Sequence, residues 1–285
     1  MTAPTPPVAL AIAGSDSGAG AGIQADIKTM GALGVFGTTV LTAVTAQNSA
    51  EVREVHPVPA AMVEAQIRAV LDDLPVAAVK TGMLGTAAVV GLVGRMAAAG
   101  SLPRPVVDPV LVSSTGRSLA DAECIDAYRR RLLPHTLVLT PNLWEAALLA
   151  DVPIDEVLGV DDMISLARTI HGWGPRWVLV KGGHLPGVES PGPGGTRHDV
   201  ADVLFDGSDV IVLNGTRVDT PNTHGTGCSL SSAIAAHLAR GADVPVAVTA
   251  AKEYVHRALA GAALWRLGRG HGPLDHLGWT QGPGD

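Results

Sequence analysis

The segment with the clearest chemistry is Pro221–Cys228, where glycines at 225 and 227 flank a threonine just ahead of the expected helix Ser229–Arg240. The first N–H groups of a helix are unpaired and carry partial positive charge, so they can bind a phosphate or a developing phosphoryl oxyanion. A plain helix cap with a tight turn would use the same residues. The Cys228 thiol favours the anion-binding interpretation over the plain cap, because a position at a helix start promotes ionisation of a thiol to the thiolate. The predicted phosphate-binding residues are Gly225, Thr226 and Gly227, next to a reactive Cys228.

A second glycine-rich stretch, Ala13–Gly22, follows an expected strand and opens an expected helix. Its glycines do not fit GxGxxG and no acidic residue ends the next strand, which argues against a dinucleotide-binding loop. The chain has no Gly-Lys dipeptide, which argues against a Walker A loop. Two interpretations stay open. The glycines let a helix pack closely on the sheet, or a small substrate lies against Gly14 with Asp26 one turn into the helix.

Charged and amide side chains follow three further expected strands. Asp108 and Asn142, a carboxylate and an amide at neighbouring strand ends, suit Mg²⁺ held through water and nucleotide phosphates, and Glu145 follows Asn142 three positions on. Asn142 and Glu145 also fit a capping box, which is the alternative explanation for both. Lys181 precedes Gly182–Gly183, which fits a phosphate contact, although a solvated lysine at a strand end would look the same.

Gln47 and Asn48 end another expected strand. A carboxamide offers one acceptor and two donors, which matches the edge of an aminopyrimidine. A turn-forming asparagine beside an incidental glutamine is the alternative.

The elements that position these residues are short apolar strands that alternate regularly with longer helical patterns. This alternation indicates an α/β fold with a mainly parallel, doubly wound sheet and helices on both faces. In such sheets, ligands bind beyond the carboxyl ends of the strands. We expect a single domain over residues 1–285, with the Gly/Pro-rich stretch Leu185–Arg197 as an inserted loop. The expected strands are Val8–Ala13, Thr38–Thr45, Val76–Lys80, Pro105–Asp108, Leu137–Thr140, Trp177–Lys181, Val200–Phe205 and Val210–Leu213. The expected helices are Ala21–Leu33, Ala60–Leu74, Thr86–Ala99, Asp121–Leu133, Leu143–Ala150, Asp161–His171, Thr226–Arg240 and Pro245–Leu267.

Composition narrows the class of protein. The formal net charge is −7, opposite to that of a basic nucleic-acid binder. No Lys or Arg precedes Lys28, which argues against a signal peptide, and the apolar run Ala87–Val93 is too short to span a bilayer. The two cysteines and ten histidines show no metal-ligand spacing. We therefore expect a cytoplasmic protein that binds neither nucleic acid nor membrane.

Taken together, the motifs resemble the hydroxymethylpyrimidine and phosphomethylpyrimidine kinases of thiamine biosynthesis, in the ribokinase-like superfamily. The matching stretches run from about residue 8 to the end; the two most specific are AGSDSGAGAGIQAD and THGTGCSLS, alongside TAVTAQNS, VKTGMLG, VVDPV, TPNLWEA and WVLVKGGH. The resemblance implies ATP and Mg²⁺ as cofactors, a homodimer, and a second phosphorylation that converts the monophosphate to the diphosphate.

The same resemblance implies roles for single residues. It places the pyrimidine by Gly14, Asp26, Gln47, Met83 and Val110, ATP by Asn142, Lys181 and the 225–228 loop, and Mg²⁺ by Asp108 and Glu145. Cys228 stands where most ribokinase-like enzymes have Asp, so it is either the general base for the hydroxymethyl group or a residue that shapes the helix start. We favour the base. Ala19 stands where many relatives have Gly, and Pro186–Arg197 has no clear counterpart.

Three rival interpretations remain. A pyridoxal or pyridoxine kinase would use the same loop on another hydroxymethyl heteroaromatic molecule, and Gln47 with Met83 after Thr81–Gly82 favours the pyrimidine instead. A non-catalytic pyrimidine sensor would not need the phosphate loop, Asn142, Glu145 or Lys181. A nicotinamide oxidoreductase lacks its glycine fingerprint.

Overall fold

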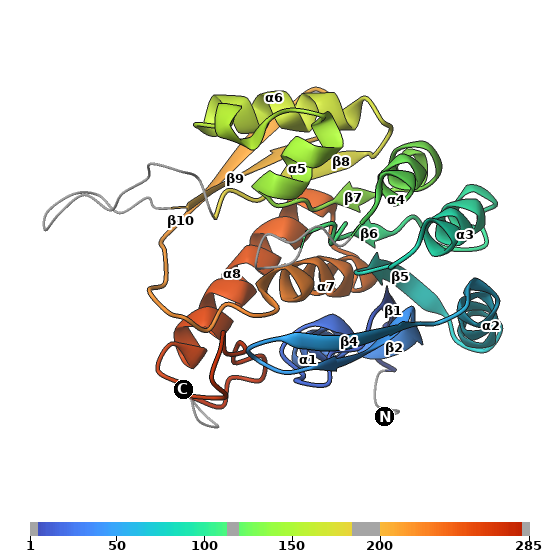
Figure 1. Cartoon of the computed structure of the whole chain (residues 1–285), viewed down its shortest axis with the longest axis horizontal. Helices are drawn as coiled ribbons and strands as arrows, with labels where there is room; N and C mark the ends of the chain where they lie inside the picture. The colour runs from blue at the N-terminus through green and yellow to red at the C-terminus, as the bar shows by residue number, and fades with distance from the viewer. Residues whose placement is uncertain (1–4, 113–119, 184–199, 281–285) are drawn as a thin grey trace, which may run out of the picture.

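A central sheet of eight strands forms the middle layer of the molecule (Figure 1). This computed structural model describes residues 5–112, 120–183 and 200–280. The strand order is β10-β9-β8-β7-β6-β5-β1-β2, and every neighbouring pair from β8 to β2 is parallel, whereas β9 is antiparallel to both of its neighbours, β8 and β10. The predicted mainly parallel sheet is therefore confirmed. The strands are β1 (Val8–Ala13), β2 (Phe36–Leu41), β5 (Val76–Thr81), β6 (Val106–Val107), β7 (Val138–Leu139), β8 (Trp177–Val180), β9 (Val200–Phe205) and β10 (Val210–Gly215).

Helices cover both faces of this sheet. One face packs against α1 (Gly22–Ala32), α7 (Thr226–Ala239) and α8 (Val244–Ala262). The other packs against α2 (Ala60–Leu71), α3 (Ala87–Ala98), α4 (Ala122–Ala127), α5 (Leu143–Ala150) and α6 (Val160–His171). Successive strand residues alternate between the two cores: Ala78 and Val106 join the α7–α8 side, and Val79 and Val107 join the α3 side. This is why doubly covered strands appear as unbroken apolar runs in the sequence.

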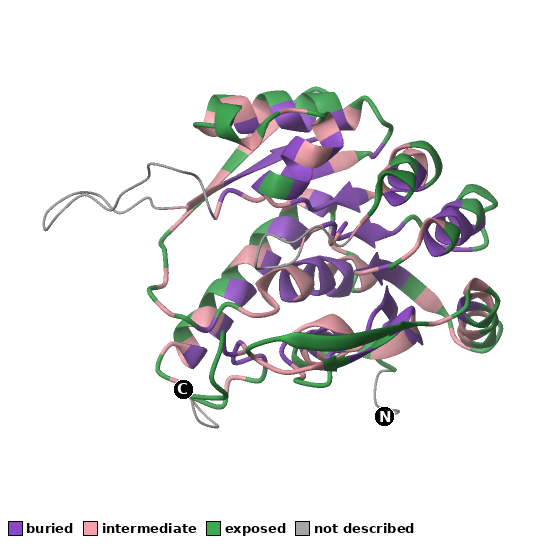
Figure 2. Ribbon diagram, in the orientation of Figure 1, coloured by how far each residue is buried: buried purple, intermediate pink, exposed green. Residues whose placement is uncertain are grey.

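The predicted strand Thr38–Thr45 is wrong in one respect, because the chain turns at Thr42. The Thr42 hydroxyl donates to the Met83 carbonyl at 2.6 Å and directs β3 (Ala43–Gln47) away from the main sheet. β3 pairs with β4 (Val52–Pro57) in a separate two-stranded hairpin, which the sequence did not predict. All six residues of β4 are exposed (Figure 2), so its sequence lacks the apolar alternation of a half-buried strand.

Three predicted helices are clearly shorter than expected, and the first of them, α2, ends at Leu71 instead of Leu74. The Asp121–Leu133 segment is α-helical only to Ala127 and continues as a wider turn over Tyr128–Leu132 and a 3₁₀ turn over Leu133–His135. α8 ends at Ala262 instead of Leu267. No helix in the described part of the chain is long and apolar enough to cross a membrane. The predicted loop Leu185–Arg197, which includes Pro186–Arg197, lies outside the described residues. The single domain over residues 1–285 stays a prediction.

Candidate active site

The start of α7 has the backbone geometry that an anion-binding loop requires. Gly225 has a φ of 88°, and a Cβ placed there would lie 1.8 Å from the Gly20 carbonyl oxygen, so only glycine fits. Among the described residues, the N–H groups of Gly227 and Cys228 have no acceptor, whereas that of Thr226 donates to the Thr223 carbonyl. Two free donors at a helix start favour a bound phosphate oxygen.

A lysine–carboxylate pair lies beside these donors. Lys181, just past β8, is 3.1 Å from Asp108 Oδ1, just past β6. A Cβ on Gly227 would lie 3.2 Å from Lys181 Nζ and 3.4 Å from Asp108 Oδ2, so the pair faces the first turn of α7. Lys181, Asp108 and Gly227 thus converge, as their positions at strand and helix ends predicted.

Asn142 and Glu145 form the capping box that was the alternative explanation for them. The Asn142 side chain accepts from the Glu145 N–H at 2.9 Å, and Glu145 Oε2 accepts from the Asn142 N–H at 2.9 Å. Burial raises the pKa of Glu145 to about 7, against the opposing charge of Lys181, and the negative charge of Asp108 raises it further. Although Glu145 caps the helix, it also lies close enough to Asp108 and Lys181 to interact with their charges, so it remains a candidate site residue.

The donor set fits Mg²⁺ only as an ion completed by phosphate and water. In the described ranges, no group of three or more His, Cys, Asp or Glu residues could hold a metal by itself. Mg²⁺ commonly uses one or two carboxylates together with substrate phosphates. Asp108 and Glu145 supply two carboxylates at the predicted phosphate site, which suits this arrangement.

Gly14 and Met83, two of the predicted substrate residues, are in contact with each other. Met83 lies against Gly14, where a Cβ would come within 2.6 Å of the methionine methyl. Val110 has a φ of 34°, a strained conformation for a β-branched residue, and such strain tends to occur at functional sites. Gln47 ends β3, and its Nε2 is 3.4 Å from His224 Nε2.

Asp26 does not reach this space as predicted. Its side chain is fully buried, 2.7 Å from Lys80 Nζ and 2.6 Å from the Ser232 hydroxyl. A direct contact between Asp26 and a ligand is therefore not what the structure shows. The carboxylate instead links α1, β5 and α7 beneath the site.

The expected activation of Cys228 is also wrong. Burial raises the pKa of this thiol to about 11, and the nearby charge of Lys80 only partly opposes the rise. The helix start alone suggested a lowered pKa, but removal from water outweighs it. Cys228 is a neutral thiol at neutral pH.

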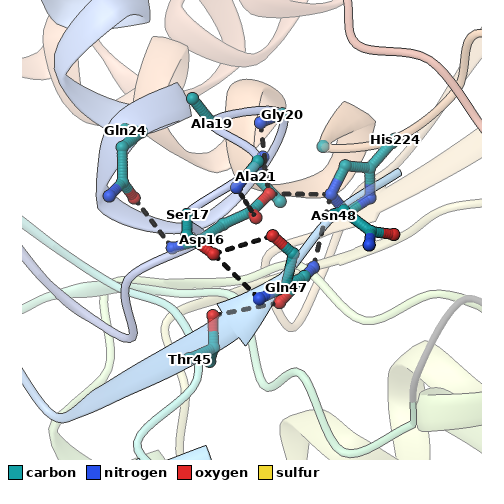
Figure 3. Close-up of polar contacts among 12 residues, drawn as sticks. Asp16, Ser17, Ala19, Gly20, Ala21, Gln24, Thr45, Gln47, Asn48 and His224 are labelled. Carbon is teal, nitrogen blue, oxygen red and sulfur yellow. Dashed lines mark hydrogen bonds and ion pairs between the residues drawn. The ribbon is translucent and has the colours of Figure 1, made fainter. Parts of the chain in front are cut away.

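Sequence reasoning missed Asp16 and His224, which join the two glycine-rich loops (Figure 3). His224 Nε2 is 2.8 Å from Asp16 Oδ2, and the Asp16 carboxylate also accepts from the N–H groups of Gly18, Gly20 and Ala21. Burial opposes ionisation of Asp16, but these hydrogen bonds outweigh it and hold its pKa below the ordinary value. Both residues lie inside the motifs, but 208 positions separate them, so no local pattern indicated their contact.

Comparison with known proteins gives a consistent result. The family model described as phosphomethylpyrimidine kinase matches residues 16–275. A Streptomyces coelicolor protein named hydroxymethylpyrimidine/phosphomethylpyrimidine kinase is 50% identical over 99% of this chain and 100% of its own length.

Two solved structures share the fold. Bacillus subtilis pyridoxal kinase, solved with ADP, is 36% identical with a TM-score of 0.83, over 97% of this chain and 100% of that one. Clostridium difficile phosphomethylpyrimidine kinase is 35% identical with a TM-score of 0.75, over 88% of this chain and 99% of that one.

Proposed function

The chain belongs to the phosphomethylpyrimidine kinase family and is a phosphotransferase of ribokinase-like fold, and on that premise we propose that it phosphorylates 4-amino-5-hydroxymethyl-2-methylpyrimidine with ATP. One observation carries the proposal: the Lys181–Asp108 pair lies at the free N–H groups of Gly227 and Cys228. These groups suit phosphoryl transfer, because catalysis of that reaction comes mainly from stabilising the charge on the transferring phosphoryl group. Phosphorylated pyrimidine should appear when ATP, Mg²⁺ and the alcohol are combined, and its absence would contradict the proposal.

The same site is proposed to phosphorylate the monophosphate to the diphosphate. The support is the double name of the S. coelicolor relative, since no residue described above requires two steps. Accumulation of monophosphate under excess ATP, followed by mass spectrometry, would refute this step while leaving the first intact.

Within the site, Lys181 and the N–H groups of Gly227 and Cys228 bind the phosphate oxygens, and Asn142 lies next to Lys181 through a parallel bridge. Asp108 and Glu145 would hold Mg²⁺, which when bound neutralises charge on the nucleotide phosphates. The chain's own contribution is to position donor and acceptor and to offer preformed positive charge.

On the pyrimidine side, Gly14 and Met83 form an apolar surface, Val110 borders it, and Gln47 contacts the ring edge. Gln47→Ala should weaken pyrimidine binding by about 5- to 150-fold, because polar groups of the ligand lose their partner. Calorimetry should show nearly unchanged ATP binding. Gln66→Ala is the matched control, since its carboxamide binds the Leu41 backbone instead.

Pyridoxal is the second candidate acceptor, and the likeness to B. subtilis pyridoxal kinase favours testing it. ATP consumption measured with each alcohol at equal concentration separates the two. Faster turnover of pyridoxal than of the pyrimidine alcohol would make pyridoxal the assigned acceptor.

We also propose a cytoplasmic location and a homodimer. The exposed valines of the β3–β4 hairpin, Val44, Val52 and Val55, offer an apolar surface that a second copy would cover. Sedimentation of the purified chain checks the assembly, and fractionation of cells checks the location.

A further inference from the structure

The carboxamide of Gln47 lies in surroundings that suit one orientation of its two ends (Figure 3). Its Oε1 is placed 3.3 Å from Thr45 Oγ1, and its Nε2 is placed 3.4 Å from His224 Nε2. The two ends are nearly the same size, so their hydrogen-bond partners decide which end lies where.

Thr45 has one hydroxyl hydrogen and two candidate acceptors. The Ser15 carbonyl oxygen is 2.7 Å away, considerably closer than Gln47 Oε1 at 3.3 Å. The hydrogen therefore goes to Ser15, which leaves only lone pairs on Thr45 Oγ1 facing Gln47. This side of the carboxamide is better matched by an N–H than by an oxygen.

His224 presents the opposite requirement. Asp16 is an ionised carboxylate that can only accept, and it lies 2.8 Å from His224 Nε2. That nitrogen therefore carries a hydrogen. A donor N–H consequently faces the amide nitrogen of Gln47, which is also a donor. This side of the carboxamide is better matched by an oxygen.

We propose that His224, held by Asp16, is a positioning residue that turns the Gln47 carboxamide so that its oxygen faces His224 and its nitrogen faces Thr45. In this orientation Thr45 donates to Ser15 and accepts from Gln47, and His224 shares its hydrogen between Asp16 and Gln47. All four side chains are then satisfied without a donor–donor or acceptor–acceptor contact.

This inference rests on the proposed function, in which Gln47 contacts the pyrimidine edge. A fixed carboxamide presents its remaining donor and acceptor in a fixed order. A 4-aminopyrimidine offers an amino donor beside a ring-nitrogen acceptor, whereas the 4-oxo analogue, in its lactam form, offers them reversed. His224 would therefore determine the preference for the amino compound over the oxo compound.

The test compares kcat/KM for the 4-amino alcohol and its 4-oxo analogue in two variants. His224→Leu removes the donor, so the amide can rotate, and the preference for the amino compound should fall by about 10-fold or more. His224→Gln keeps an N–H that can reach Asp16 and Gln47, and it should preserve most of the preference. KM for ATP should change little in either variant.

The matched control is His56→Ala, because His56 is exposed on β4 and makes no side-chain hydrogen bond within the described part of the chain. An unchanged preference in His224→Leu, or equal loss of preference in the Leu and Gln variants, would overturn the inference. If His224→Leu does not fold, Asp16→Asn serves instead, since an amide no longer forces a hydrogen onto His224 Nε2. A lowered preference there supports the inference, and an unchanged one overturns it.

Failure of the proposed function gives a different result. If the wild-type protein phosphorylates neither pyrimidine, the acceptor assignment falls. If the wild-type protein is active and prefers the amino compound, but the variants keep that preference, only the role of His224 falls.

Discussion

Two lysine–aspartate pairs lie near the start of α7, and they differ in burial. Lys80 and Asp26 are 2.7 Å apart with both side chains 0% exposed. Lys181 and Asp108 are 3.1 Å apart, with 17% of the lysine and 4% of the aspartate exposed. From this difference we expect the same chemical pair to be structural in one place and functional in the other, with access of the lysine to solvent distinguishing the two.

The neighbours of each pair explain the difference. Asp26 accepts from Lys80 of β5 and Ser232 of α7, so the buried pair joins three elements. Lys181 faces Gly227 and is flanked by Asp108 and Glu145, so its charge remains available to a ligand. The first pair should therefore affect folding, and the second should affect turnover.

The largest effect is expected from Lys80→Met. It leaves Asp26 buried without its cation, which costs about 3–5 kcal/mol of unfolding free energy. Urea unfolding followed by circular dichroism measures the loss. The double variant Lys80→Met/Asp26→Leu should recover much of it, because a buried pair replaced by apolar groups is often tolerated. If Lys80→Met lowered the unfolding free energy no more than an average surface substitution does, the Lys80–Asp26 pair would not be the structural one.

Lys181→Met should instead lower kcat/KM for ATP by about 10²- to 10³-fold, the usual effect of losing one donor to transition-state charge. The unfolding free energy should fall much less than in Lys80→Met, because 17% of the Lys181 side chain is already exposed, whereas the Lys80 side chain is fully buried. Arg68→Met is the control, since Arg68 pairs with Glu64 on the exposed side of α2. If the control loses as much activity, the assignment of Lys181 is wrong.

Asp108→Asn is expected to raise the Mg²⁺ concentration that gives half-maximal activity by at least about 10-fold. Asp26→Asn should leave that concentration unchanged in the protein that remains folded, because Asp26 has no access to the ligand space. Magnesium titrations of both variants provide the test. Equal shifts would mean that burial does not separate the two aspartates.

The smallest effect is expected from Cys228→Ala, which lies between the two pairs. A thiol with a pKa of about 11 holds its proton at neutral pH, so the loss should be under about 10-fold and similar for the alcohol and the monophosphate. Steady-state rates with both acceptors measure it. A much larger loss with the alcohol alone would restore the general-base hypothesis.

The convergence of the proposed phosphate-binding residues could be predicted from sequence because these residues follow a rule of position. Parallel strands end at one edge of a sheet, so Asp108, Asn142 and Lys181 had to approach one another once the strands were recognised. The expected ends of β6, β7 and β8 differ from the observed ends by only one residue, so the residues that follow these strands were still identified correctly.

The pyrimidine side could not be predicted in the same detail. The contact between Asp16 and His224 joins two loops from opposite ends of the chain. Asp26 was expected to lie beside the substrate, and no pattern in the sequence indicated that it pairs with Lys80, 54 positions away. The pKa of Cys228 followed burial, which only the packed structure reveals.

The close approach of Gly225 to the Gly20 carbonyl has a thermodynamic consequence. The loop that offers N–H groups to the nucleotide and the loop that carries Asp16 are in backbone contact, so ordering one restricts the other. Ligands that order a shared element favour each other's binding, and linkage requires the effect to be reciprocal. The nucleotide and the pyrimidine should therefore each raise the affinity of the protein for the other by the same factor, and the enzyme would hold its two substrates most tightly when both are present.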